Sequence, residues 1–135
     1  MQLEINNTTK QKINTKVLKQ AAAIFSRKMK INKRIVSVAF VSQAKIKELN
    51  KRYRGLNRVT DVLSFADSGP SLGELIIYYP QIKQQAKKLR QTIDNELAFI
   101  FIHGLLHLAG YDDAADRGHK EMMEIGKKLS NQITK

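Results

Sequence analysis

Apolar and polar positions follow two different patterns along the chain, and each pattern predicts one kind of secondary structure. Alternation with a period of two, or a short run of β-branched residues, favours a strand. Apolar residues that recur every three to four positions favour an amphipathic helix. Strands are predicted over residues 2–6, 34–41 and 72–79 and in a segment ending at 65, and helices over 10–28, 80–90 and 115–130, between 42 and 55, and from a cap at 92 or 94 to 110.

The predicted strands and helices interleave, which is typical of an α+β fold in which helices pack on a sheet. The turn residues 67–71 separate two strands by a short connection, so we expect these strands to be antiparallel neighbours. The prediction is a small mixed sheet of four strands packed by about five helices, in a single domain that spans residues 1–135. Three residues can cap the first helix: Asn7, Thr8 and Thr9.

One predicted helix carries two histidines in an otherwise apolar segment. From Leu97 to Ala109, every residue except His103, Gly104 and His107 is apolar, so we expect this helix to be buried in the centre of the fold. Residues four apart lie on the same face of a helix, which lets two imidazoles reach one metal ion. Because burying two unpaired imidazoles costs free energy, we favour a metal site over a pair of core histidines.

A third ligand is available just beyond this helix. Gly110 can adopt the left-handed conformation that ends a helix and turns the chain back. Asp113 follows His107 by six residues, where its carboxylate can reach the same ion. A catalytic zinc site uses three protein ligands and leaves one position for water. His103, His107 and Asp113 are therefore the predicted ligands of one zinc ion, although nickel or manganese also suits these donors.

The positive charge of the chain is concentrated in its first half. The net charge is +12, and residues 1–60 hold 15 Lys and Arg against two acids, Glu4 and Glu48. Residues 61–135 hold nine Lys and Arg against ten acids. A basic surface of this kind is typical of nucleic-acid binders, and we prefer this interpretation to a surface that only keeps the protein soluble.

Composition restricts the compartment and the partners. The chain has no cysteine, so it has no disulfide-linked partner and no thiolate zinc site, which suits a reducing compartment. Its first residues lack the pattern of a signal peptide. Its longest apolar run is shorter than the roughly 20 residues that a membrane span needs. We therefore expect a cytoplasmic protein without a membrane partner.

The helix predicted between residues 42 and 55 ends in a basic segment. We expect its buried side to hold Ile46, Leu49 and Tyr53. Arg54 stands at its end, where a planar guanidinium can clamp a phosphate group. An arginine at this position can instead interact with the last carbonyl groups of its own helix. The sequence leaves both roles open.

Three segments together resemble the YbeY family: residues 103–112, residues 53–55 leading into 60–65, and residues 72–74. The resemblance covers nearly the whole chain. It implies a zinc-dependent endoribonuclease that cleaves single-stranded RNA, acts in 16S ribosomal RNA 3′-end maturation and in ribosome quality control, and works with the small ribosomal subunit. It also implies that His103 and His107 bind zinc and that Arg54 is the arginine near the active site. We predict Arg54 as the catalytic residue, and Arg54 and Arg58 as the basic groups that hold the RNA.

The chain departs from the family pattern at the third zinc ligand. The family has a histidine where this chain has Asp113. A carboxylate binds zinc at about the same distance as an imidazole, but its charge makes the ion a weaker Lewis acid and raises the pKa of its water. His119 is an alternative ligand, yet the ungapped spacing after residue 113 favours Asp113. Val59 also replaces a common family proline, which loosens the loop.

The sequence does not identify the general base, and it leaves alternatives to the ribonuclease function. Zinc can activate a water or polarise a phosphodiester oxygen, while Asp61, Glu74 and the 2′-hydroxyl of RNA are unranked as proton acceptors. Metalloproteases carry a glutamate directly after the first histidine, where this chain has Gly104. This difference argues against a zinc peptidase. A ribosome assembly factor with a structural metal is the other alternative.

Overall fold

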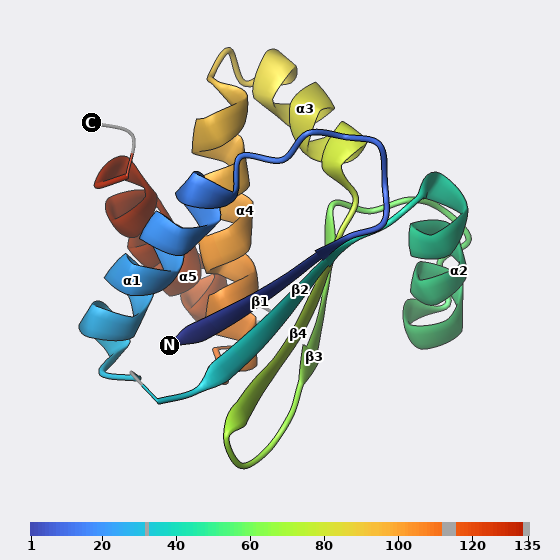
Figure 1. The fold of residues 1–135 in the computed structure, drawn as a ribbon. Helices are drawn as coiled ribbons and strands as arrows, with labels where there is room; N and C mark the ends of the chain where they lie inside the picture. Colours follow the sequence, from blue (N-terminus) through green and yellow to red (C-terminus); the bar gives the residue numbers. More distant parts are fainter. Residues whose placement is uncertain (32, 112–115, 134–135) are drawn as a thin grey trace.

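The computed structural model describes residues 1–31, 33–111 and 116–133, and its elements are shown in Figure 1. Strands and helices alternate along most of the chain, as the patterning predicts. In chain order, the elements are β1 (Gln2–Asn7), α1 (Thr15–Met29), β2 (Ile35–Phe40), α2 (Gln43–Arg54), β3 (Val62–Ala66), β4 (Ser71–Ile77), α3 (Tyr79–Lys88), α4 (Ile93–Leu108) and α5 (Asp116–Asn131).

The four strands form one mixed sheet in the order β1-β2-β4-β3. β1 pairs with β2 and β2 pairs with β4 in parallel, whereas β3 and β4 are antiparallel. The α+β fold with a small mixed sheet is therefore confirmed, as is the antiparallel pair on either side of the turn at 67–71. Within the described chain β3 pairs only with β4, so its other edge is open.

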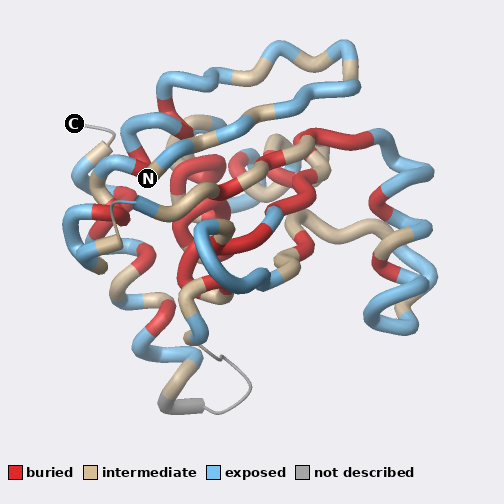
Figure 2. The backbone as a smooth tube through the Cα atoms, turned by 60° about the horizontal axis from the view of Figure 1, so that its bottom comes forward, coloured by how far each residue is buried: buried red, intermediate tan, exposed pale blue. Residues whose placement is uncertain are grey.

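Helices cover the two faces of the sheet unequally (Figure 1). α1, α4 and α5 lie on one face, and α2 lies on the other. The main core joins the first face to α1 and α4, while a smaller cluster packs Ile46 of α2 against Leu63 and Ile76 of the sheet. Figure 2 shows that the buried residues gather at the centre and that most of α2 is exposed.

α4 is the central buried helix that the apolar run predicts. Ten of its 13 residues from Glu96 to Leu108 are buried, and it packs against α1, α3, α5, β3 and β4. Thr92 caps its N-terminus by accepting a hydrogen bond from the Asn95 backbone N–H at 3.0 Å. None of the helices within the described ranges has both the length and the hydropathy needed to cross a bilayer.

Two predicted boundaries are wrong for local reasons. α1 begins at Thr15 rather than near residue 10, because Asn7 accepts hydrogen bonds from Thr9 in a separate turn before the helix. The strand predicted over 72–79 ends at Ile77, because Tyr79 and Pro80 begin α3. Proline lacks an N–H donor and has a helical φ, so it favours the first turn of a helix over the end of a strand.

Candidate functional site

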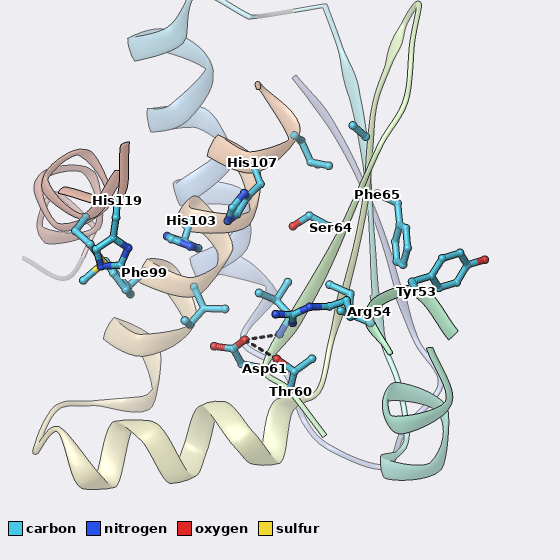
Figure 3. A pocket seen from close by; sticks show the side chains of 16 residues that line it. Tyr53, Arg54, Thr60, Asp61, Ser64, Phe65, Phe99, His103, His107 and His119 are labelled. Carbon is cyan, nitrogen blue, oxygen red and sulfur yellow. Dashed lines mark hydrogen bonds between the residues drawn. The ribbon is translucent and has the colours of Figure 1, made fainter. Parts of the chain in front are cut away.

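A cavity of about 830 Å³ lies between α4 and the strand β3 (Figure 3). The end of α2, the segment leading into β3, and α5 complete its walls. All five residues of β3 line it, so the cavity borders the open edge of the sheet. The polar and aromatic residues that line it are Tyr53, Arg54, Thr60, Asp61, Ser64, Phe65, Phe99, His103, His107 and His119.

His103 and His107 lie one helical turn apart on α4, and both line the cavity. Their ring centroids are 4.8 Å apart and the ring planes are 79° apart. Phe99, one turn earlier, lies beside His103 with its centroid at 6.2 Å. Gly104, next to His103, packs on Leu75 of the sheet and does not line the cavity. These two imidazoles are together and fit the nitrogen donors that zinc prefers.

The third predicted ligand, Asp113, lies outside the described residues. Gly110 has a φ of +98°, which agrees with the predicted turn after α4. The alternative ligand His119 is exposed on α5 and lines the same cavity. Across residues 1–31, 33–111 and 116–133, however, no three His, Asp or Glu side chains are grouped closely enough to hold an ion. His119 therefore does not complete a ligand triad with the two imidazoles in this structure.

Arg54 is brought into the cavity, whereas Arg58 is not. Gly55, with a φ of +72°, ends α2 directly after Arg54, and its N–H donates to the carbonyl groups of Asn50 and Lys51. The carbonyls of Asn50 and Lys51, near the helix end, are thus satisfied by the backbone. Figure 3 shows the Arg54 guanidinium reaching toward Asp61. Arg58 is exposed and absent from the cavity wall, and its carbonyl accepts from Asn50 Nδ2 at 2.9 Å.

Of the two candidate carboxylates, Asp61 lines the cavity and Glu74 does not. Asp61 lines the cavity and accepts hydrogen bonds from the Val62 N–H at 2.7 Å and from Gln85 Nε2 at 3.3 Å. Glu74 is exposed and precedes Leu75, which packs on α4. Because neighbouring side chains of a strand point to opposite faces, Glu74 faces away from α4. Asp61 is therefore the carboxylate that the fold brings to the cavity.

Glu96 is a buried carboxylate that the sequence pattern does not single out. Its side chain is 3% exposed and accepts hydrogen bonds from Gln85 Nε2 and Gln91 Nε2, both at 2.7 Å. Burial raises the pKa of Glu96 above its ordinary value of 4.5, the nearby Asp61 raises it further, and the two glutamines act in the opposite direction. The sequence signal for this residue was a glutamate just before an apolar run. The same signal is equally typical of an exposed glutamate in the first turn of a helix, so it did not predict burial.

Tyr53 was expected on the buried side of α2, and this prediction is wrong. The residue is 58% exposed at the rim of the cavity. Its ring meets Phe65 of β3 edge to face, with centroids 4.9 Å apart and planes 70° apart. Ile46 is the one buried apolar residue of α2. The apolar side of α2 is therefore buried near Ile46 and exposed in the last turn of the helix.

Comparison with known proteins supports the resemblance. The family model described as Endoribonuclease YbeY matches residues 2–134. A protein named Endoribonuclease YbeY from Ureaplasma parvum serovar 3 is 37% identical over 143 residues, which cover 98% of this chain and 92% of that protein. One of the same name from Helicobacter pylori is also 37% identical, over 90% of this chain and 86% of its own.

A solved structure agrees with these matches. The solution structure of TM1509 from Thermotoga maritima aligns with a TM-score of 0.68 and 34% identity, covering 97% of this chain and 88% of the other. The family model and the relatives extend over α2, β3 and α4, the elements that build the cavity. The chain belongs to the YbeY family.

Proposed function

We propose that this chain is a zinc-dependent endoribonuclease that cleaves single-stranded RNA. The observation that carries the proposal is that His103, His107 and Arg54 line one cavity. Two imidazoles suit a divalent cation, and a guanidinium matches the oxygens of a phosphate. Relatives that cover most of the chain are named endoribonucleases, which supports the same reaction class here.

The proposed ligands of a single zinc ion are His103, His107 and Asp113. When bound, the ion supplies a Lewis acid that activates a water or polarises a phosphodiester oxygen. Arg54 holds the phosphate by charge-assisted hydrogen bonds. Asp61 is the proposed proton acceptor, because it lines the cavity and Glu74 does not; the 2′-hydroxyl of the RNA is the alternative.

The surroundings of Gly104 favour a nuclease over a peptidase. A Cβ at this position would lie 2.9 Å from Leu75 Cδ2 and 3.1 Å from Leu75 Cδ1, and Leu75 is fully buried. The general-base glutamate of a metalloprotease occupies the position after the first histidine. Here that position packs against Leu75 of the sheet and does not line the cavity, so a glutamate would not fit.

The proposed cellular role is 16S ribosomal RNA 3′-end maturation and ribosome quality control in the cytoplasm, with the small ribosomal subunit as partner. The excess of basic residues in the first half of the chain supports an anionic polymer as substrate. The competing role is a ribosome assembly factor whose metal is structural. In that case, removing the metal should unfold the protein and abolish RNA association together.

The test uses purified protein, zinc and an end-labelled single-stranded RNA, with duplex RNA and a casein peptide as controls. We expect cleavage of single-stranded RNA alone, loss of cleavage in EDTA, and recovery when zinc is restored. His103→Ala should stay folded, bind RNA and no longer cut it, whereas His119→Ala should keep its activity. Unchanged cleavage in His103→Ala would overturn the proposal, and unfolding of that variant with loss of RNA binding would favour the assembly factor.

A further inference from the structure

Tyr53 is unusual because it exposes a large aromatic ring. Among the described residues, three large hydrophobic side chains are exposed, and Tyr53 is the aromatic one; the others are Leu89 and Ile93. Tyr53 also lies at the rim of the cavity, next in sequence to Arg54. An exposed aromatic ring beside a phosphate-binding group is a common feature of surfaces that bind single-stranded nucleic acids.

Phe65 supports the Tyr53 ring without covering it. The two ring centroids are 4.9 Å apart in an edge-to-face arrangement, so Phe65 contacts one side of Tyr53 at most, and the residue as a whole is 58% exposed. Phe65 itself is held on β3 and packs against the smaller core cluster, of which Tyr53 is not a member. The ring is thus positioned by the fold while more than half of the residue remains accessible.

The side chains near Tyr53 carry positive charge that can bind phosphate groups. Lys51, Arg52 and Arg54 occupy the last turn of α2, and only Arg52 has an ion pair within the described residues, with Glu48 at 3.2 Å. Because Arg54 reaches into the cavity and Tyr53 lies at its outer side, a strand that runs out of the cavity can place a phosphate at the guanidinium and a flanking base on the ring. Figure 3 shows Arg54 reaching into the cavity and Tyr53 at its outer side.

We propose that Tyr53, supported by Phe65, is a stacking platform for an RNA base that flanks the phosphate held at Arg54. This inference rests on the proposed function, because it assumes that the ligand is single-stranded RNA. Stacking on an aromatic ring tolerates every base, since each has a flat π face. The platform therefore orders a strand next to the histidines without selecting its sequence.

The chain offers a direct spectroscopic test because it contains no tryptophan. Tyr53→Trp places the chain's single tryptophan at the platform, and Leu89→Trp places it at an exposed site outside the cavity as the matched control; excitation selective for tryptophan avoids the signal of the tyrosines. Each variant is titrated in EDTA, so that RNA is bound and not cut, with a short oligoadenylate and with an abasic strand of equal length. We expect oligoadenylate to quench the indole emission of the Tyr53→Trp variant, the abasic strand to leave it nearly unchanged, and neither to affect the Leu89→Trp signal.

Binding measurements separate stacking from charge. Tyr53→Ala should weaken oligoadenylate binding about 10-fold and leave abasic binding unchanged, and Tyr53→Phe should restore the affinity. Arg54→Ala should instead weaken both strands and reduce the salt dependence of binding. Thermal unfolding of each variant checks that it is folded.

The inference fails if Tyr53→Trp emission does not respond to oligoadenylate, if both strands quench it equally, or if the wild-type protein does not bind oligoadenylate. Binding and quenching in a protein that never cleaves RNA would keep the platform and overturn only the proposed function. The two conclusions are therefore tested by separate readouts.

Discussion

Gln85 on α3 donates a 2.7 Å hydrogen bond to Glu96 on α4. The same amide nitrogen lies 3.3 Å from Asp61, at the entrance to β3. One glutamine therefore joins two helices to the segment that carries the cavity carboxylate. Such a partly buried polar network fixes the relative position of its elements when its members are satisfied.

The protonation of Glu96 makes stability depend on pH. Its pKa is raised in the folded protein, chiefly by burial, from an ordinary value of 4.5. Between 4.5 and the raised pKa, the folded state binds more protons than the unfolded state, so the free energy of unfolding falls as pH rises. Glu96→Gln should flatten this fall when urea unfolding is followed across the acidic range.

The control for this prediction is Glu124→Gln, which changes an exposed glutamate on α5. It should leave the pH dependence of the unfolding free energy as in the wild type. An unchanged pH dependence in Glu96→Gln would show that the raised pKa of Glu96 does not contribute to stability.

Arg54→Ala should reduce RNA cleavage by about 10- to 100-fold, since a hydrogen bond to a charged group is worth about 1.5–3 kcal/mol. Arg54→Lys should recover part of the loss because it keeps the charge without the planar fork. Arg58→Ala is the matched control, since Arg58 is equally basic and exposed but does not line the cavity. Equal losses in the two alanine variants would contradict a specific role for Arg54, and initial cleavage rates at fixed salt measure the difference.

Gly73→Ala should destabilise the fold by about 2 kcal/mol or more, because it adds both backbone strain and overpacking. Gly73 has a φ of +148°, and a Cβ there would meet the Phe65 carbonyl oxygen and would lie 2.7 Å from Leu108 Cδ2. Gly69→Ala is the control: its φ is +70°, but nothing lies within 4 Å of the added atom. Urea unfolding should show that Gly73→Ala is the less stable variant. If Gly73→Ala lowers the free energy of unfolding no more than Gly69→Ala does, the close packing of Gly73 against Phe65 and Leu108 would be refuted.

The strongest local signals in the sequence predicted the elements that build the site. The apolar run from Leu97 to Ala109 predicted a buried helix, because such a helix has no polar face to expose to solvent. Its two histidines are four residues apart, so they share one face of that helix. Ser42 and Gly55 also delimit α2 as predicted, with Ser42 accepting from the Lys45 N–H and Gly55 in the left-handed region. These features depend on nearest neighbours along the chain.

Features that depend on packing between distant segments could not be predicted in this way. The exposure of Tyr53 follows from where α2 lies on the sheet, and its apolar spacing alone indicated burial. The burial of Glu96 depends on glutamines from α3 and the following turn. The ranking of Asp61 above Glu74 required the strand register, because side-chain direction alternates along a strand.

The central claim is that one divalent cation is held by the imidazoles of α4 and a carboxylate beyond its end. A zinc-edge anomalous difference map from crystals soaked in zinc tests it most directly. The account predicts one strong peak bonded by nitrogen atoms of His103 and His107 and by an oxygen of Asp113. A map without density between the two imidazoles, or with zinc bound only at His119, would contradict it.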